Sequence, residues 1–276
     1  MTMTLDLSPF IKPRFEVNRV VKVYGIDGST VGDVELPQQF FETVREDLIL
    51  RAYLSALTAR LQPKGTDPMA GKRTTAISFG IGLGLARVPR VKGSLWPTAR
   101  FAPNVVKGRR AHPPKVEKVL HERINKRERR KAIRSAIAAT AIKDLVLARG
   151  HVIDKVPQIP LIVNNDFERI GTMNDLRRAL TALGVWDDIE RSHESIRIRS
   201  GKGKGRGRRY KERRSLLIVT GSVTPVIEVA NNLPGVDAVP VRNLSVLYLA
   251  PGGVPGRLTL WTLNAIEELR RGLFLG

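Results

Sequence analysis

Apolar and polar residues alternate over residues 20–36, and this pattern predicts a β-hairpin. The segment reads VVKVYGIDGSTVGDVEL, with alternating positions on either side of Asp27 and Gly28. A period of two residues is typical of a strand with one buried face, and an Asp-Gly pair favours a two-residue hairpin turn. We therefore expect the turn at Asp27-Gly28.

Helical spacing predicts two long helices, over residues 43–61 and 125–150. Each opens with a polar residue that is followed three positions later by glutamate, at Thr43 and at Asn125. This spacing is that of a capping box. The first turns of the second helix are heavily basic, which is unfavourable beside the positive end of a helix dipole and favours an anion there. Gly150 is expected to end this helix.

Buried strands and amphipathic helices alternate in the rest of the chain. The predicted strands are residues 159–163, 215–220, 238–241 and 258–261, and the predicted helices are 172–184, 224–232 and 262–272. Such alternation indicates an α/β fold, in which helices flank a mostly parallel or mixed sheet. We expect one globular domain of this kind, interrupted by a long extended basic loop between its first two long helices.

Charge changes this picture, because it is concentrated in two segments. The 276 residues include 47 Lys and Arg against 26 Asp and Glu, a net charge of +21. The first basic segment, residues 62–116, has 11 cations and one acid. The second basic segment, residues 197–214, has 10 cations and one acid. The remaining residues are nearly neutral, so the two segments predict a polyanionic partner.

Neither basic segment has a pattern that would let it fold alone. The first carries seven glycines and seven prolines, which block long helices and discourage central strands. The second reads SGKGKGRGRRYKERR over residues 200–214, and its glycines would let the backbone approach a phosphate chain closely. The first segment, residues 62–116, is far longer than the loops that compact domains normally contain, so we expect it to be functional or disordered.

The sequence offers weak signals for an enzyme or a metal site. GIGLG at 80–84 lacks the third glycine and the acid of a dinucleotide fingerprint, and residues 65–74 lack the spacing of a P-loop. The four histidines are scattered and there is no cysteine, so we expect no metal site. Asp166 and Glu168, which follow a predicted strand, are the one candidate catalytic pair, although a polar loop explains them better.

Three motifs resemble the universal large-subunit ribosomal protein L-four family, in its archaeal–eukaryotic branch. They are SFGIGLGLARVPRVKG at 78–93, VVKGRRAHPPK at 105–115 and LAPGGVPGRLTLWT at 249–262. The resemblance runs from about residue 18 to 272, so residues 1–17 would form an N-terminal extension and 18–276 a single domain. Leu83 departs from the family, which usually has arginine there.

The resemblance implies a body on the outer face of the large subunit and a loop that reaches the wall of the polypeptide exit tunnel. The tip of that loop would comprise Arg87, Val88, Pro89, Arg90, Val91, Lys92, Gly93 and Trp96. Together with the charge pattern, it gives the following candidate RNA-binding residues: Lys72, Arg73, Arg87, Arg90, Lys92, Arg100, Lys107, Arg109, Arg110, Lys115, Lys126, Arg127, Arg130, Lys202, Lys204, Arg206, Arg208, Arg209, Tyr210 and Arg257. Trp96 and Tyr210 are expected to stack on unpaired bases, and Phe79 and Phe101 are further candidates.

The function expected is that of a non-enzymatic structural protein of the large ribosomal subunit. Its partners would be ribosomal RNA, neighbouring ribosomal proteins and, at the loop tip, the nascent polypeptide. We expect a cytoplasmic location in the ribosome, no membrane contact and no cofactor, with Mg²⁺ only as part of the bound RNA. Two alternatives remain open: an RNA-processing or RNA-modifying enzyme with a site at residues 164–168, and a free nucleic-acid-binding regulator.

Overall fold

The computed structural model describes residues 17–275, which fall into two compact units. One unit combines the residues up to 57 with those from 122 onward, and the other spans residues 58–121. The predicted N-terminal extension, residues 1–17, lies outside the described residues except for Val17.

The first unit is built on a six-stranded sheet with the strand order β2-β1-β3-β8-β6-β7. Its strands are β1 (Val20–Tyr24), β2 (Thr30–Glu35), β3 (Leu161–Val163), β6 (Leu217–Thr220), β7 (Asp237–Pro240) and β8 (Thr259–Thr262). β1 and β2 pair antiparallel, and all other pairs are parallel. The residues of β3, β6 and β8 are buried throughout, as expected of parallel strands that are covered on both faces. The predicted α/β class is confirmed.

The predicted hairpin is confirmed, but Asp27 and Gly28 lie in a loop over residues 25–29 rather than in a two-residue turn, and the backbone N–H of Gly25 donates to the carbonyl of Ser29 at 2.8 Å. Val20 pairs with Glu35, and the register shifts between Val23 and Tyr24. Gly28 has φ +77°, and a β-carbon there would come within 2.7 Å of the carbonyl oxygen of Ala182. Both the turn conformation and this close approach require glycine.

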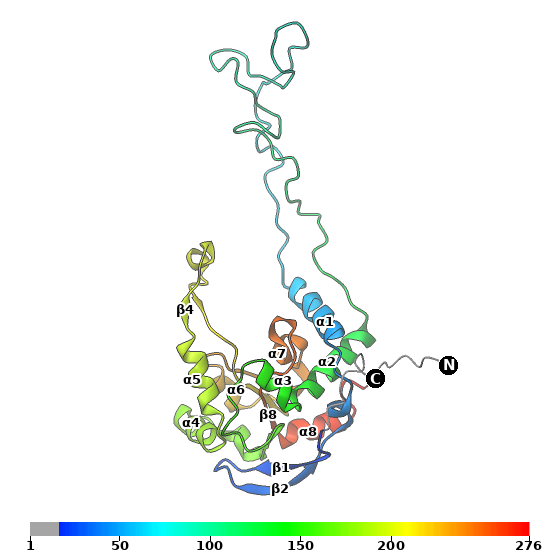
Figure 1. Cartoon of the computed structure of the whole chain (residues 1–276), viewed down its shortest axis with the longest axis vertical. Helices are drawn as coiled ribbons and strands as arrows, with labels where there is room; N and C mark the ends of the chain where they lie inside the picture. The colour runs from blue at the N-terminus through cyan, green and yellow to red at the C-terminus, as the bar shows by residue number, and fades with distance from the viewer. Residues whose placement is uncertain (1–16, 276) are drawn as a thin grey trace, which may run out of the picture. The chain divides into compact units, whose positions relative to one another are not determined.

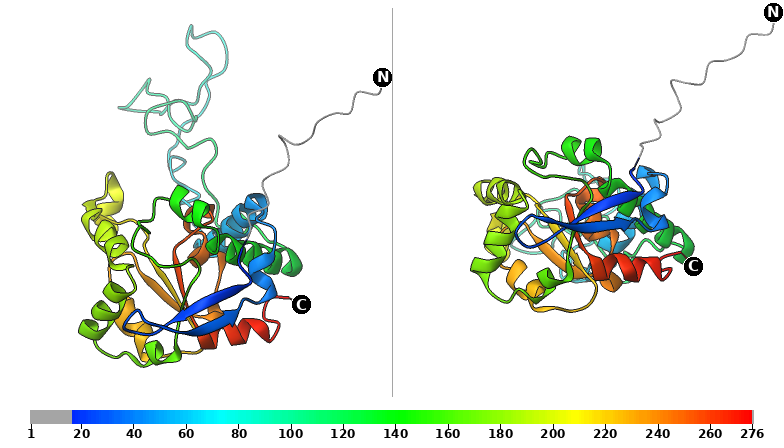
Figure 2. Two further views of the ribbon diagram at one scale, coloured as in Figure 1. Left: turned by 60° about the horizontal axis from the view of Figure 1, so that its bottom comes forward. Right: turned by 90° about the horizontal axis from the view of Figure 1, so that it is seen from below.

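Helices cover both faces of the sheet (Figures 1 and 2). On one face lie α1 (Glu46–Thr58), α2 (Lys126–Thr140), α7 (Val246–Leu249) and α8 (Leu263–Arg270), and on the other lie α3 (Lys143–Ala148), α4 (Met173–Ala182), α5 (Trp186–Glu194) and α6 (Pro225–Ala230). Each face has its own hydrophobic core, and strand side chains alternate between them. Ile162 belongs to the core under α1, α2, α7 and α8, whereas Leu161 and Val163 belong to the core under α3, α4, α5 and α6. Among the described residues, no helix has the length and apolar content that a membrane span requires.

The boundaries of the two long helices differ from the prediction. The first begins at Glu46 rather than beside Thr43, whose carbonyl instead accepts a hydrogen bond from the Ser135 hydroxyl. Asn125 does cap the second helix, because its side chain accepts from the backbone N–H of Arg127. The predicted helix 125–150 is broken into α2 and α3, because Ile142 is extended, with φ −100° and ψ 109°.

Short elements complete the structure. Single 3-10 turns lie at Gln38–Phe41, Asn165–Arg169, Lys202–Arg206, Val241–Asn243 and Pro251–Gly253. The second basic segment, predicted to be a loop, contains a two-stranded antiparallel ribbon of β4 (Arg197–Ile198) and β5 (Tyr210–Lys211). The elements α5, α7 and this ribbon were not predicted from the sequence.

The unit of residues 58–121 has no α-helix or extended β-strand beyond the end of α1. Its two arms run alongside each other, because the backbone N–H of Thr66 donates to the carbonyl of Pro114 at 3.3 Å. The unit also has local order in residues 77–100, which we call the loop tip. There, single β-bridges join Ile77 to Arg90 and Arg90 to Ala99.

Candidate nucleic-acid interface

Most candidate cations of the first basic segment are exposed and have no acidic partner among the described residues. These are Lys72, Arg87, Lys92, Lys107, Arg110 and Lys115, together with the half-buried Arg109. Arg73 differs, because it forms an ion pair with Asp67 at 2.5 Å. The tip residues Val88, Pro89 and Val91 are half-buried, whereas Gly93 is exposed. Uncompensated cations at this density favour an external anion.

Two predicted RNA-binding arginines instead bind carbonyl groups of their own segment. The Arg90 guanidinium donates to the carbonyls of Pro97 at 2.6 Å and Ala86 at 3.4 Å. The Arg100 guanidinium donates to the carbonyl of Val106 at 2.5 Å. Arg90 therefore organises the loop tip and Arg100 links it to the segment that follows, and fewer of their N–H groups are available to a phosphate.

The aromatic residues of the two basic segments differ in their surroundings. Trp96 packs edge-on against Phe79, with ring centroids 4.6 Å apart, and it remains 42% exposed. Phe101, the fourth candidate, is 38% exposed. Tyr210 is 60% exposed, and the guanidinium of Arg209 lies over its ring at 5.8 Å. Tyr210 thus presents the larger free surface to a base, and Trp96 presents the part not covered by Phe79.

The second basic segment displays its cations on the ribbon and on the turn that joins the two strands. Lys202, Lys204, Arg206, Arg208 and Arg209 are all exposed and have no ion pair within the described chain. Arg199 supports this turn from within, since its Nε donates to the carbonyl of Arg208 at 3.1 Å. The candidate RNA-binding residues of the second basic segment therefore lie on one short element.

A buried polar group, which we call the Asp188 cluster, anchors this segment to the body. The Asp188 carboxylate accepts hydrogen bonds from His151 Nδ1 at 2.9 Å, Ser215 Oγ at 2.8 Å, Arg191 Nε at 2.9 Å and the backbone N–H of Val152 at 3.0 Å. Burial raises the pKa of Asp188, but the hydrogen bonds from His151 and Ser215 outweigh burial and hold the pKa at about 2. Burial lowers the pKa of His151, so its ring is neutral and donates through Nδ1.

The same region ties together the two ends of the second basic segment. Ser192 of α5 donates to the carbonyl of Arg213 at 2.6 Å, and the backbone N–H of Arg213 donates to Ser195 Oγ at 2.8 Å. Arg191 also donates to the carbonyl of Arg214 at 3.2 Å. These contacts hold the base of the ribbon against the C-terminal end of α5.

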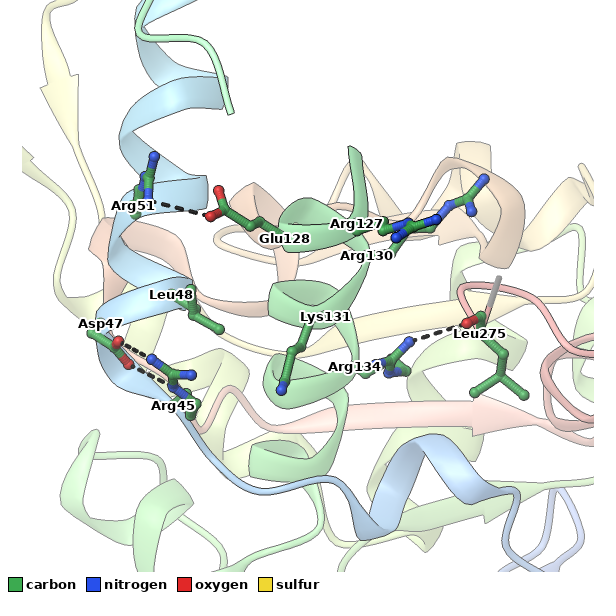
Figure 3. A pocket seen from close by; sticks show the side chains of 10 residues that line it. All are labelled: Arg45, Asp47, Leu48, Arg51, Arg127, Glu128, Arg130, Lys131, Arg134 and Leu275. Atoms are coloured by element: carbon green, nitrogen blue, oxygen red, sulfur yellow. Dashed lines mark hydrogen bonds and ion pairs between the residues drawn. The ribbon is translucent and has the colours of Figure 1, made fainter. Parts of the chain in front are cut away.

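A third basic surface lies on α2, where Lys126, Arg127 and Arg130 were predicted to bind RNA. All three are exposed. Figure 3 shows a hollow beside α2 that is lined by Arg127 and Arg130 and by residues outside the predicted set: Arg45, Asp47, Leu48, Arg51, Glu128, Lys131, Arg134 and Leu275. The spacing of positions 127, 130, 131 and 134, which puts four cations on one helix face, would have revealed the α2 part of this set.

Arg257, predicted to bind RNA, is fully buried in the body, so this prediction is wrong. It forms an ion pair with Asp237 at 2.7 Å. It also donates to the carbonyls of Ser215, Tyr248, Leu216 and Gly235. Burial lowers the pKa of Arg257. Its role is to join β6, β7 and the segment before β8, with no atom exposed to a nucleic acid.

The candidate catalytic pair does not form a site. Glu168 is buried, and its carboxylate accepts hydrogen bonds from the Gly221 backbone at 2.9 Å, Thr262 Oγ1 at 2.6 Å and Asn264 Nδ2 at 2.9 Å. Asp166 is exposed and accepts from Asn164 at 2.9 Å. Glu168 therefore links the ends of β6 and β8. Within residues 17–275, no group of three or more His, Cys, Asp or Glu side chains is arranged to hold a metal ion.

Comparisons of the sequence with known proteins point to one family. The sequence profile of the Ribosomal protein L4/L1 family matches residues 34–272. A "Large ribosomal subunit protein uL4" of Pyrobaculum aerophilum is 59% identical over 98% of this chain and 96% of its own length. Proteins of the same name from Methanocaldococcus jannaschii and Methanococcus vannielii are 52% and 50% identical over 90% and 91% of this chain, and over 97% and 98% of their own lengths.

Proposed function

The chain belongs to the Ribosomal protein L4/L1 family, and from this premise we propose that it is a structural, RNA-binding constituent of the large ribosomal subunit in the cytoplasm. The observation that carries this proposal is the concentration of uncompensated cations in two segments attached to a nearly neutral body. Ribosomal RNA supplies the phosphates that such segments need, and counterion release drives their association. The partners would be this RNA and neighbouring ribosomal proteins, and the proposed role requires no catalysis and no cofactor of the protein's own.

We further propose that the first basic segment penetrates the RNA and brings the loop tip to the wall of the exit tunnel. Support comes from its composition, because glycines permit close approach to phosphates and prolines reduce the cost of ordering an extended path. Lys107, Arg110 and Lys115, on the arm that follows the loop tip in the sequence, would bind phosphates. The exposed tip residues Arg87 and Lys92 would face the nascent chain.

A photoreactive residue at Lys92, introduced in cells that make this protein, tests the proposal. Lys92 is exposed and has no ion pair among the described residues, so its replacement should leave the tip intact. We expect crosslinks to large-subunit RNA and to short nascent chains. The same group at Val223, an exposed body position, is the control and should give no nascent-chain crosslinks.

The remaining outcomes are also informative. Crosslinks to RNA without nascent chains would remove the tunnel role. Crosslinks to this chain alone would contradict penetration of the RNA. A free regulator would leave the large subunits during a high-salt wash, whereas a structural constituent should still sediment with them.

A further inference from the structure

A hollow of about 680 Å³ crosses the exposed face of α2, between α1 and the segment that ends at Leu275 (Figure 3). We call it the α1–α2 hollow. Its walls are fixed to each other, because Ser135 of α2 accepts a hydrogen bond from the backbone N–H of Arg45 at 2.6 Å. The half-buried pair of Arg134 and Glu42, at 3.0 Å, adds a second link. The hollow therefore exists before any ligand arrives.

Half of the six cations that line the hollow have no acidic partner in the described chain. Arg45 is paired with Asp47, Arg51 with Glu128 and Arg134 with Glu42. The other three, Arg127, Arg130 and Lys131, lie on one helix face at positions i, i+3 and i+4. Three like charges held this close favour a bound anion, and a phosphate has the charge and the acceptors for them.

The other side of the hollow does not suit a phosphate. The carboxylates of Asp47 and Glu128 line it, together with the apolar side chain of Leu48. One oxygen of Glu128, Oε2, is buried and has no hydrogen-bond partner. A second phosphate would be repelled by these carboxylates, whereas an amino or imino group of a nucleobase would donate to them.

The same side also provides a flat surface for stacking. The guanidinium of Arg45 is held by two hydrogen bonds to Asp47, from Nε at 3.3 Å and from a terminal nitrogen at 2.6 Å. A guanidinium that is bonded through its edge leaves its face available to a ring. Arginine faces are a common platform for unpaired bases of RNA.

From this arrangement we propose that the α1–α2 hollow binds one unpaired nucleotide of the RNA. Its phosphate lies on Arg127, Arg130 and Lys131, and its base stacks on Arg45 and donates to Glu128. The inference rests on the proposed RNA-binding function and adds to it the kind of nucleotide that this surface selects. A fully paired duplex has no unstacked base for Arg45 to stack on, and so it contacts only the three cations.

The test compares two triple variants of the full chain. R127Q/R130Q/K131Q removes the three uncompensated charges of the hollow, and R206Q/R208Q/R209Q removes three charges from the second basic segment. All six side chains lack ion pairs among the described residues, so both variants should fold. The probes are a labelled eight-nucleotide single-stranded RNA and an abasic strand of the same length, with affinity measured by fluorescence anisotropy across a salt series.

We expect the wild-type chain to prefer the base-containing strand by about fivefold or more, the range expected for stacking of one base. The hollow variant should lose the part of this preference that the hollow contributes and keep the part due to stacking on Trp96 and Tyr210. Its salt slope should fall by about 2, near 0.7 for each lost phosphate contact. The control variant should bind more weakly while it keeps the preference.

Other results would overturn the inference in distinguishable ways. Equal binding of both probes by the wild type would mean that the hollow holds backbone only. An unchanged hollow variant beside a weakened control variant would remove the hollow and leave the proposed function intact. Loss of affinity by neither variant would contradict electrostatic RNA binding itself. A hollow variant that binds RNA normally but no longer sediments with large subunits would assign the hollow to a protein partner.

Discussion

Replacement of Asp188 by asparagine should cause a large loss of stability. The side chain of Asp188 is fully buried and accepts four hydrogen bonds, from three side chains and one backbone amide. Asparagine keeps one acceptor oxygen, but its amide would face donors that need an acceptor, and Arg191 would lose its charged partner. Removal of one member of a buried ion pair costs about 3–5 kcal/mol, and we expect D188N to fall in this range.

The neighbouring residue provides a matched control. Asp187 also lies in the first turn of α5, but its ion pair with Lys155, at 2.8 Å, is solvent-exposed. D187N should therefore cost about 1 kcal/mol or less. S215A, which removes one of the four donors to Asp188, should cost about 1 kcal/mol. The free energy of unfolding can be measured by guanidinium chloride titration at pH 7, with the buried Trp261 as a fluorescent reporter.

Acid titration tests the same cluster independently. The pKa of Asp188 is about 2 in the folded chain against 3.8 for the free side chain, so its stabilising effect is present above pH 3.8 and is lost as the pH falls towards 2. This difference corresponds to about 2 kcal/mol, which D188N should not show. His151, whose pKa is also lowered, adds a loss of stability below pH 6.5, because the unfolded chain then binds the extra proton. If D188N matched D187N at pH 7, the hydrogen-bonded carboxylate would not be what anchors this region.

Three further predictions concern residues whose roles the structure defines. E168A should lower the free energy of unfolding by about 3 kcal/mol in the same titration, because three donors lose their acceptor, whereas D166A should change it by less than about 0.5 kcal/mol. R257M should destabilise the body by about 3 kcal/mol while the salt slope of RNA binding stays unchanged; a smaller slope would show that this arginine reaches RNA after all. R90K should speed hydrogen exchange of the Ile77 and Arg100 amides about tenfold with little effect on global stability, and R87K should leave these amides as they are in the wild type.

Local patterns could predict most elements of the body but not their arrangement. The hairpin, the buried strands and the capped helices follow from periodicity and from turn or cap residues close by in the sequence. The insertion of β8 between β3 and β6 depends on pairing between segments about 40 and 100 residues apart, which no local pattern encodes. The helix α7 was missed because it has only four residues, and α5 because Val185 gives it no side-chain cap. The strands β4 and β5 were missed because each has only two residues.

The charge of the sequence could predict which segments form the candidate interface, but not which of their cations are available to RNA. The sequence does not separate a cation that faces solvent from one that faces its own chain. Arg257 forms an ion pair with Asp237, which lies 20 positions earlier in the sequence. Arg90 donates a hydrogen bond to the carbonyl of Pro97, across the turn of the loop tip. The α1–α2 hollow was missed for the opposite reason, because α1 and α2 are about 70 residues apart in sequence and only folding brings Arg45 beside Lys131.

The two hydrophobic cores contain no buried residue from either basic segment. Mutations in those segments can therefore alter affinity for a polyanion without changing the melting behaviour of the body, and selection can act on the two traits separately. α2 is the exception, since its inner face supplies buried alanines and isoleucines while its outer face carries the cations. Substitutions in this helix are therefore limited both by packing on its inner face and by charge on its outer face. It should tolerate fewer neutral substitutions than the first basic segment, residues 62–116.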